Sequence, residues 1–238
     1  MNITVLGAGA WGTALARMLA AREHAVTLWD HFPETLETIR RTGRNERYLP
    51  GVELPANLRL AAGASEAEAG AELIVVASVS KGFREVTKTL GSFRGIVASV
   101  TKGIEYETGL TMSGVLAETA PRARVVAMSG PTLAMEVARG VPTAIVAASA
   151  DAAAAQTVQG LFHSPAFRVY TSSDVHGVEL GGALKNVIAI GAGVCDGLGF
   201  GDNSKAALLT RSVSEMRRLG VACGAQAETF TGFSGLGD

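Results

Sequence analysis

The sequence predicts an α/β fold in which a doubly wound parallel sheet in an N-terminal domain is followed by an all-helical C-terminal domain. Short β-rich runs alternate with helical patterns from residue 2 to residue 170, as in sheets built from βαβ units. A glycine-rich turn follows the first of these runs. After residue 170 every remaining pattern is helical. We place the boundary in the polar segment 171–174, which gives domains at 1–174 and 175–238.

The first turn has the pattern of a dinucleotide site. A β-rich run at 2–6 leads into Gly7-Ala8-Gly9-Ala10-Trp11-Gly12, a helical pattern at 13–20 and a second β-rich run at 25–29. In this context the first glycine permits a tight turn, the second lets the backbone approach a pyrophosphate, and the third lets the helix pack on the strand. The phosphates would lie over free amide groups at the helix N-terminus. We therefore expect a Rossmann-like domain that binds NAD or NADP at Gly7, Gly9 and Gly12.

The residues after the second strand leave the choice of cofactor open. Asp30 suits a ribose 2′-hydroxyl and would repel a 2′-phosphate, which favours NAD. His31 beside it, or Arg40 and Arg41 further on, could accommodate the extra phosphate of NADP. Asp30 could instead cap a helix, because Pro33 lies one turn further along the chain.

Three more predicted strands end in residues typical of a ligand site. They are 73–77, 95–100 and 124–128, and they lead into Ser78-Val79-Ser80-Lys81-Gly82, Thr101-Lys102-Gly103 and Ser129-Gly130-Pro131-Thr132. In open α/β sheets, ligands bind at the carboxyl ends of the strands. Taken singly, each segment would more often be a turn, and Lys102 alone would be a surface lysine. Together they predict one edge of a binding site.

The other segments complete the alternation. The stretch 44–51 is polar and turn-rich, and we interpret it as a surface excursion. Helices are expected at 61–71, 133–139 and 151–162, and strands at 143–147 and 167–170.

One lysine interrupts a helical pattern that is otherwise apolar nearly all round. The run 178–189 is typical of a core helix, and it contains Lys185 followed by Asn186. No neighbour of Lys185 at helical spacing can pair with an ammonium group. Loss of water lowers the pKa of a lysine and lets it exchange a proton, so Lys185 is a candidate for catalysis. A lysine that extends to solvent is the alternative, and this segment alone leaves both open.

The chain closes with a glycine-rich loop at 196–201 and a helix at 204–219. Asp202 and Asn203 are expected to cap this helix. The final segment, 229–238, is a glycine-rich turn that leads to Asp238. Such a turn usually opens an element, so we expect the natural protein to continue beyond it.

Composition narrows the class of protein. Of 238 residues, 47% are hydrophobic and 18% charged, which indicates a globular chain, and the net charge of -1 predicts neither a nucleic-acid partner nor an anionic membrane surface. No apolar run is expected to reach membrane-spanning length. Cys195 and Cys223 lack motif spacing and are interpreted as reduced thiols of a cytoplasmic protein. The four histidines are scattered, so we expect no metal site.

The blocks described above resemble bacterial NAD(P)-dependent sn-glycerol-3-phosphate dehydrogenase. The matching blocks follow the order of the family along the whole chain, at 7–16, 48–51, 101–103, 129–134, 177–186, 197–203 and 235–238. The resemblance implies a nucleotide-binding α/β domain and an all-helical domain. It also implies an oxidoreductase that interconverts glycerol 3-phosphate and dihydroxyacetone phosphate for phospholipid biosynthesis, a branch of lipid metabolism.

The resemblance also implies cofactor contacts. They fall on Ala10, Trp11, His31 and Ala134, with Lys102 contacting both the cofactor and the substrate. In the biosynthetic direction the cofactor would be the reduced form of NAD or NADP.

The substrate contacts implied by the resemblance lie further along the chain. Gly130 and Thr132 would line the substrate site, Lys185 would be the proton donor or acceptor, and Asp238 would lie beside the substrate. The expected substrate is a small phosphorylated molecule. The oligomeric state stays open, with a homodimer as one alternative.

Two departures from the family pattern are visible. Val79 stands where the family usually has a proline, which bears on the shape of that loop. The family continues past Asp238 into a Ser-Arg-Asn segment that grips the substrate phosphate, and this sequence stops at Asp238. From this we expect the 238-residue chain to bind cofactor but to turn over poorly.

The chemistry needs a proton donor where negative charge develops. Hydride transfer to a ketone builds charge on the oxygen, so a desolvated Lys185 can hydrogen-bond the carbonyl and deliver the proton. Asn186 or Asp238 could orient it, and Lys102 adds a positive charge that attracts the phosphate.

Two other readings stay open from the sequence. Another lysine-dependent dehydrogenase, of the β-hydroxyacid or ketopantoate type, would share the two-domain plan. A non-catalytic dinucleotide-binding module would bind the cofactor without needing Lys185.

Overall fold

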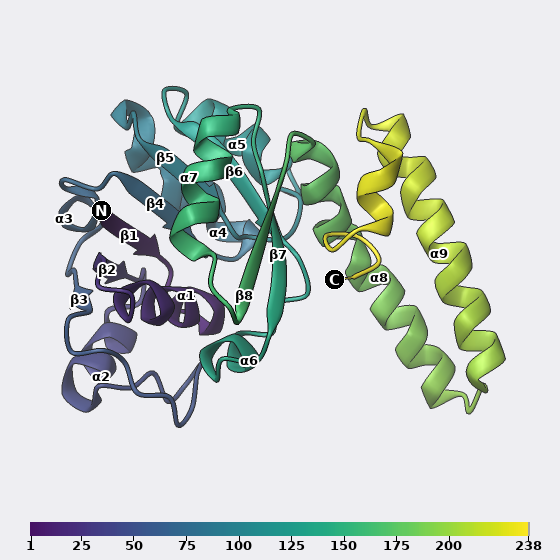
Figure 1. Cartoon of the computed structure of the whole chain (residues 1–238), viewed down its shortest axis with the longest axis horizontal. Coiled ribbons are helices and arrows are strands. Elements are labelled where there is room, and N and C mark those ends of the chain that lie inside the picture. The colour runs from purple at the N-terminus through teal and green to yellow at the C-terminus, as the bar shows by residue number, and fades with distance from the viewer. Residues whose placement is uncertain (238) are drawn as a thin grey trace.

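The carboxyl ends of six parallel strands are brought to one edge of a mixed eight-stranded sheet (Figure 1). The computed structural model describes residues 1–237. Within them, the strand order is β3-β2-β1-β4-β5-β6-β7-β8. The strands are β1 (Asn2–Leu6), β2 (Ala25–Trp29), β3 (Arg59–Leu60), β4 (Leu73–Val76), β5 (Ile96–Ser99), β6 (Arg124–Ser129), β7 (Thr143–Ala148) and β8 (Phe167–Ser172).

The sheet is doubly wound, as predicted. The chain moves outward from β1 to β2 and β3, then returns to place β4 on the other side of β1. Strand order therefore reverses between β1 and β4, where Ile3 pairs with Val26 on one side and with Leu73 on the other. In sheets of this kind such a reversal opens a crevice at the carboxyl ends of the strands. The switch point places the glycine turn after β1 beside the end of β4.

Two strands, β7 and β8, run against the other six. β7 pairs antiparallel with β6 and parallel with β8, whereas the sequence predicted a parallel sheet throughout. The connection from β6 to β7 carries only the short helix α6 (Ala134–Ala138), which packs against α1 and not across a face of the sheet. Because the connection does not cross the sheet, β7 starts at the edge where β6 ends and returns in the opposite direction.

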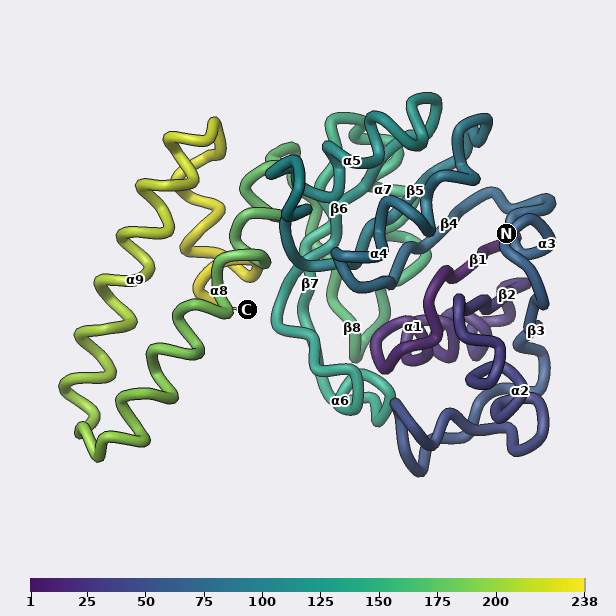
Figure 2. The backbone as a smooth tube through the Cα atoms, turned by 180° about the vertical axis from the view of Figure 1, so that it is seen from behind, coloured from purple at the N-terminus to yellow at the C-terminus, as the bar shows by residue number. Residues whose placement is uncertain are grey.

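Helices cover both faces of the sheet (Figures 1 and 2). β4 is buried on both sides: Leu73 and Val75 face one hydrophobic cluster, and Ile74 and Val76 face the other. This follows from the period of two in a strand and explains its unbroken apolar run. The first cluster includes residues of α1 (Ala10–Ala20), α2 (Pro33–Thr42) and α7 (Ala152–Phe162), and the second includes residues of α3 (Ala64–Glu68), α4 (Ser80–Thr87), η1 (Lys88–Ser92) and α5 (Met112–Thr119).

Beyond β8 the chain is helical, as predicted. α8 (Val175–Gly197) and α9 (Asp202–Ala222) form a hairpin beside the sheet, and η2 (Ala227–Thr231) returns toward the start of α8 (Figures 1 and 2). The buried Asp174 carboxylate holds this return, because it accepts hydrogen bonds from the amides of Gly177 and Gln226 and from the hydroxyl of Thr229.

The prediction that the α8 segment lies entirely in a core is wrong beyond its first half. Residues 177–182 are buried, but Val187 is 71% exposed and Ile190 is 69% exposed. α8 also extends to Gly197, into the predicted loop. The N-cap of α9 is Gly201, without a side-chain cap, so Asp202 is the first helical residue.

α8 also shows that the expectation of no apolar run of membrane-spanning length is wrong. By length and composition alone it could cross a membrane. Core helices of soluble proteins pass the same test, and the first half of α8 packs against β6, β7 and η2. Its apolar character there is accounted for by this packing.

The segment after α2 lies at the surface, as its composition indicated, with Glu46, Arg47, Pro50 and Gly51 exposed, but buried side chains anchor it. Asn45, Leu49 and Val52 are buried, and the two apolar residues pack against Ala14 of α1. Polar, turn-rich composition indicates irregular backbone, but it does not indicate whether that backbone is covered.

Candidate active site

The glycine turn after β1 is shaped by close backbone contacts. Gly7 has φ +113°, and a Cβ there would lie 2.6 Å from the carbonyl oxygen of Ala77, at the end of β4. A Cβ on Gly12 would overlap the carbonyl oxygen of Gly7. A side chain at either position would separate α1 from the turn or β1 from β4. The predicted structural requirements for the first and third glycines are therefore met.

The start of α1 has the features of an anion site. Its N-cap is Gly9, no side chain caps the helix, and its first turn carries no acidic residue. Nothing lies within 4 Å of the place where a Cβ of Gly9 would project, so the backbone is open there. Free amide groups and the helix dipole favour a phosphate at such a terminus. The residues present thus fit the pyrophosphate of a dinucleotide.

Asp30 lies at the end of β2 beside this turn. Its Oδ2 accepts a hydrogen bond of 2.5 Å from the amide of Ala8, and its Oδ1 accepts one of 2.8 Å from the amide of Phe32. α2 begins at Pro33 with Phe32 as its N-cap, so Asp30 does not cap that helix. His31 is exposed and packs edge-on against the ring of Phe32.

Trp11 and Ala134 come together, although they are far apart in sequence. Both pack against the hydrophobic cluster of Ala14, Leu49, Val52 and Ala138. α6, which begins at Ala134, thereby forms a wall beside the start of α1. Two predicted cofactor contacts thus lie on one side of the crevice.

The ends of β4, β5 and β6 meet as predicted. Lys102 lies three residues beyond Ser99, the last residue of β5. It is half-buried, and its Nζ donates a 3.1 Å hydrogen bond to the carbonyl oxygen of Gly130. The Thr132 hydroxyl donates to the same oxygen at 3.1 Å. The Thr101 hydroxyl donates to the carbonyl of Ser78 at 2.8 Å, which joins the ends of β4 and β5. These contacts bring Lys102, Gly130 and Thr132 to one place.

α8 reaches the same edge of the sheet. A Cβ on Gly182 would overlap the Ser129 hydroxyl and lie 3.6 Å from Cγ of Lys102, so the helix backbone itself touches the strand ends. Lys185 follows three residues later and therefore lies on the same helix face, one turn further along. It is half-buried, less so than the core position predicted, and Asn186 beside it is exposed. Asp238 lies outside the described residues.

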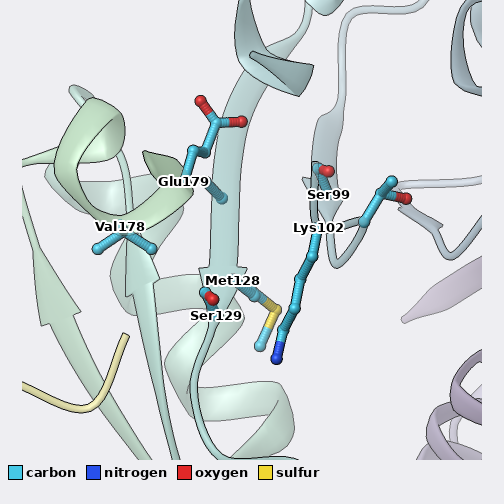
Figure 3. A pocket seen from close by; sticks show the side chains of 8 residues that line it. Ser99, Lys102, Met128, Ser129, Val178 and Glu179 are labelled. Atoms are coloured by element: carbon cyan, nitrogen blue, oxygen red, sulfur yellow. The ribbon is translucent and has the colours of Figure 1, made fainter. Parts of the chain in front are cut away.

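Sequence reasoning missed Glu179, which lines a small cavity next to Lys102. The cavity also includes Ser99, Ser129 and Met128 (Figure 3). In Figure 3 the Lys102 side chain extends alongside Met128, and the Glu179 carboxylate points away from it. The acid accepts hydrogen bonds from the amide of Ser113 at 2.7 Å and from its hydroxyl at 2.5 Å, at the start of α5.

Glu179 is 8% exposed, and this burial raises the pKa of its carboxyl group despite the hydrogen bonds from Ser113, which act in the opposite direction. In the sequence, the signal for this contact is that Glu179 is an acidic residue within an otherwise apolar helical run.

In residues 1–237, no group of three or more His, Cys, Asp or Glu side chains is arranged to hold a metal ion.

The doubly wound sheet, the uncapped helix start and the lysines at its edge define a dinucleotide-dependent oxidoreductase. Residues 2–155 match the family model for the N-terminus of NAD-dependent glycerol-3-phosphate dehydrogenase, and residues 174–238 match the model for its C-terminus. The chain belongs to the NAD-dependent glycerol-3-phosphate dehydrogenase family.

Individual relatives agree with this assignment. The chain is 51% identical to "Glycerol-3-phosphate dehydrogenase [NAD(P)+]" of Trichlorobacter lovleyi, over 100% of this chain and 73% of that protein. It is 50% identical to the protein of the same name from Geobacter metallireducens, over 100% of this chain and 72% of the relative. The crystal structure of glycerol-3-phosphate dehydrogenase from Coxiella burnetii superposes with a TM-score of 0.95 at 37% identity, covering 100% of this chain and 74% of that one.

Proposed function

We propose that this chain is the NAD(P)-dependent enzyme that interconverts glycerol 3-phosphate and dihydroxyacetone phosphate. The observation that carries the proposal is the meeting of Lys102, Gly130 and the backbone of α8 at the edge of the sheet that also carries the uncapped start of α1, in a chain whose two parts both match the family. Because the chain belongs to the glycerol-3-phosphate dehydrogenase family, a dehydrogenase of the β-hydroxyacid or ketopantoate type is no longer needed to explain its sequence. The substrate is a small phosphorylated molecule.

The dinucleotide is assigned to the glycine turn. Gly7, Gly9 and Gly12 shape the turn, and the amides of Ala10 and Trp11 lie in the uncapped first turn of α1. Asp30, His31, Lys102 and Ala134 are the further cofactor contacts that we propose. When bound, the nicotinamide donates or accepts the hydride.

The protein's part in the reaction is to place positive charge and a proton at the carbonyl oxygen. We assign the proton to Lys185, on the face of α8 that meets the strand ends. Lys102 lies one helical turn away beside Gly182, where its charge attracts the phosphate and opposes the charge that develops on oxygen. Gly130, Thr132 and Asn186 are assigned to the substrate site, with Asp238 as a further proposed contact.

We also propose a division of the chain into two domains at residue 174. We assign 1–174 to dinucleotide binding and 175–238 to substrate binding and catalysis, since β8 ends at Ser172 and α8 begins at Val175. A cytoplasmic location, a role in phospholipid biosynthesis and a homodimeric state complete the proposal. Sedimentation of the purified protein tests the last of these.

Replacing the proposed proton donor tests the mechanism. We expect Lys185→Ala to lower kcat by about 10²–10⁴-fold, the usual contribution of a positioned acid or base, and to change the Kd for NADH by less than about twofold. Turnover is followed as loss of reduced-nicotinamide absorbance with dihydroxyacetone phosphate, and binding as NADH fluorescence.

Lys205→Ala is the matched control. Lys205 is also a half-buried lysine of the helical hairpin, but it pairs with Asp196 at the far end. Its replacement should leave kcat unchanged. Equal loss of turnover and NADH binding in Lys185→Ala would contradict the catalytic role. A chain extended past residue 238 that binds NADH without consuming it would indicate a binding module.

A further inference from the structure

We propose that Asn45 is a positioning residue for the dinucleotide, because its hydrogen bonds hold the glycine turn in the conformation that binds the phosphates. This inference rests on the proposed function, because it assumes that the turn binds the cofactor. Asn45 belongs to the segment 43–58 between α2 and β3, here called the α1 clamp. None of the cofactor contacts proposed above lies in this segment.

The contacts of Asn45 are buried and specific. The residue is 2% exposed, and its Nδ2 donates 2.8 Å hydrogen bonds to the carbonyl oxygen of Ala8 and to the hydroxyl of Thr13. Thr13 is fully buried and its hydroxyl donates in turn to the Ala8 carbonyl at 3.2 Å. Both hydrogens of the Asn45 amide are therefore used, inside a region that excludes water. Bonds of this kind are costly to leave unmade.

Ala8 is held from two directions. Its carbonyl is fixed by Asn45, and its amide donates to Asp30. Ala8 lies between Gly7 and Gly9, immediately before the open start of α1. Side chains therefore order the turn without using the amides of the first helical turn, which stay available for phosphate. A turn ordered before the ligand arrives loses less entropy on binding.

The α1 clamp also holds the remainder of α1. Nε of Arg17 donates to the carbonyl of Glu53 at 3.0 Å. At the far end of the helix, Nδ2 of Asn57 donates to the carbonyl of Ala20, also at 3.0 Å. Asn45 and Asn57 thus both donate to a main-chain carbonyl from the same segment, Asn45 in the turn just before α1 and Asn57 at the last residue of the helix. The two ends of α1 lie about 16 Å apart, given its 11 residues and the helical rise.

The two asparagines differ in burial, because Asn45 is 2% exposed and its amide makes two hydrogen bonds, whereas Asn57 is exposed and makes one. They also differ in what they touch, and this second difference separates a role in binding from a role in stability. Loss of either asparagine removes an amide-to-carbonyl hydrogen bond and weakens the packing of the clamp on α1. Only Asn45 touches the turn that faces the phosphates. If the role of Asn45 were only structural, both variants would have a lower Tm and an unchanged Kd for NADH.

The test compares Asn45→Ala with Asn57→Ala in the 238-residue chain. NADH fluorescence gives Kd and thermal unfolding gives Tm. We expect Tm to fall by about 2–6 °C in Asn45→Ala and by less in Asn57→Ala, whose side chain is exposed. We expect Kd for NADH to rise tenfold or more in Asn45→Ala and to change less than twofold in Asn57→Ala. In steady-state assays the KM for NADH should rise with Kd in Asn45→Ala, while KM for dihydroxyacetone phosphate stays within twofold.

If Asn45→Ala does not fold, Asn45→Leu is measured by the same criteria, since it keeps the approximate size of the side chain, carries no charge and removes the amide donor. An unchanged Kd in the folded Asn45 variant, or equal rises in Kd in the Asn45 and Asn57 variants, would overturn the inference. Failure of the wild-type chain to bind NADH would instead overturn the proposed function, so the two failures are distinguishable.

Discussion

Replacing Gly181 of α8 by alanine sets two opposing effects against each other. Alanine is favoured over glycine in a helix interior by about 0.8–1.0 kcal/mol. A Cβ at this position, however, would overlap the main-chain carbonyl oxygen of Ser234, roughly 1 Å inside ordinary van der Waals separation. Overpacking of this kind costs about 1–3 kcal/mol, and a main-chain oxygen cannot rotate away as a side chain can. We expect a net loss of about 1 kcal/mol.

Gly193 supplies the matched control in the same helix. Nothing lies within 4 Å of the place where its Cβ would project, so Gly193→Ala keeps only the gain in helix propensity. For a chain of this size, 1 kcal/mol corresponds to about 2–4 °C in Tm. Thermal unfolding should therefore show a rise of about 2–4 °C for Gly193→Ala and a fall of similar size for Gly181→Ala.

Turnover adds a second measure of the same perturbation. Lys185 lies one helical turn beyond Gly181, so a displaced α8 moves the proposed proton donor, and a shift of about 1 Å can cost about 10²-fold in rate. We expect kcat to fall in Gly181→Ala alone. Equal rises in Tm for the two variants would refute the reasoning, because they would mean that α8 separates from Ser234 at no cost.

Two further predictions concern buried acids and pH. Arg84, through two hydrogen bonds, and Thr108 lower the pKa of Glu105 to about 2, so its contribution to stability is complete above its ordinary pKa near 4.5 and is lost as the pH falls toward 2. Urea unfolding of Glu105→Gln should therefore show lower stability at pH 7 and a flatter decline below pH 4.5, and an unchanged acid slope would contradict this. Burial raises the pKa of Glu179, so its contribution is complete below pH 4.5 and is lost as the pH rises through the raised value. Glu179→Gln, which keeps the shape, should remove that decline, whereas a steeper decline in the variant would show that the ionised form is the one the fold favours.

The first βαβ unit could be predicted almost residue by residue. The alternating pattern at Asn2–Leu6 and Ala25–Trp29 and the glycine spacing are local signals, and the structure has both strands with those bounds. The meeting of Lys102 and Gly130 could also be predicted, because parallel strand ends share one edge of a sheet.

Other features depend on contacts that no local pattern encodes. β3 has two residues, too few for a periodic signal, and the reversed direction of β7 depends on where α6 packs. Asn45 lies in a polar, turn-rich stretch, and only the structure shows that it is buried against the glycine turn and Thr13 of α1. The exposed half of α8 has the same apolar composition as its buried half, so composition could not distinguish them.

The direction of β7 determines how far along α8 a lysine must lie to reach the crevice. β7 and β8 both run away from the edge where β6 ends, so the chain leaves β8 at the opposite margin, and α8 must travel back along the sheet (Figure 1). Lys185 lies ten residues after Val175, which is a distance of about 15 Å along the helix axis. A six-residue strand such as β6 is about 20 Å long, so the helix returns over most of the height of the sheet before it reaches Lys185. Had β7 been parallel, the same helix would have set out from the crevice and carried its lysine away from it.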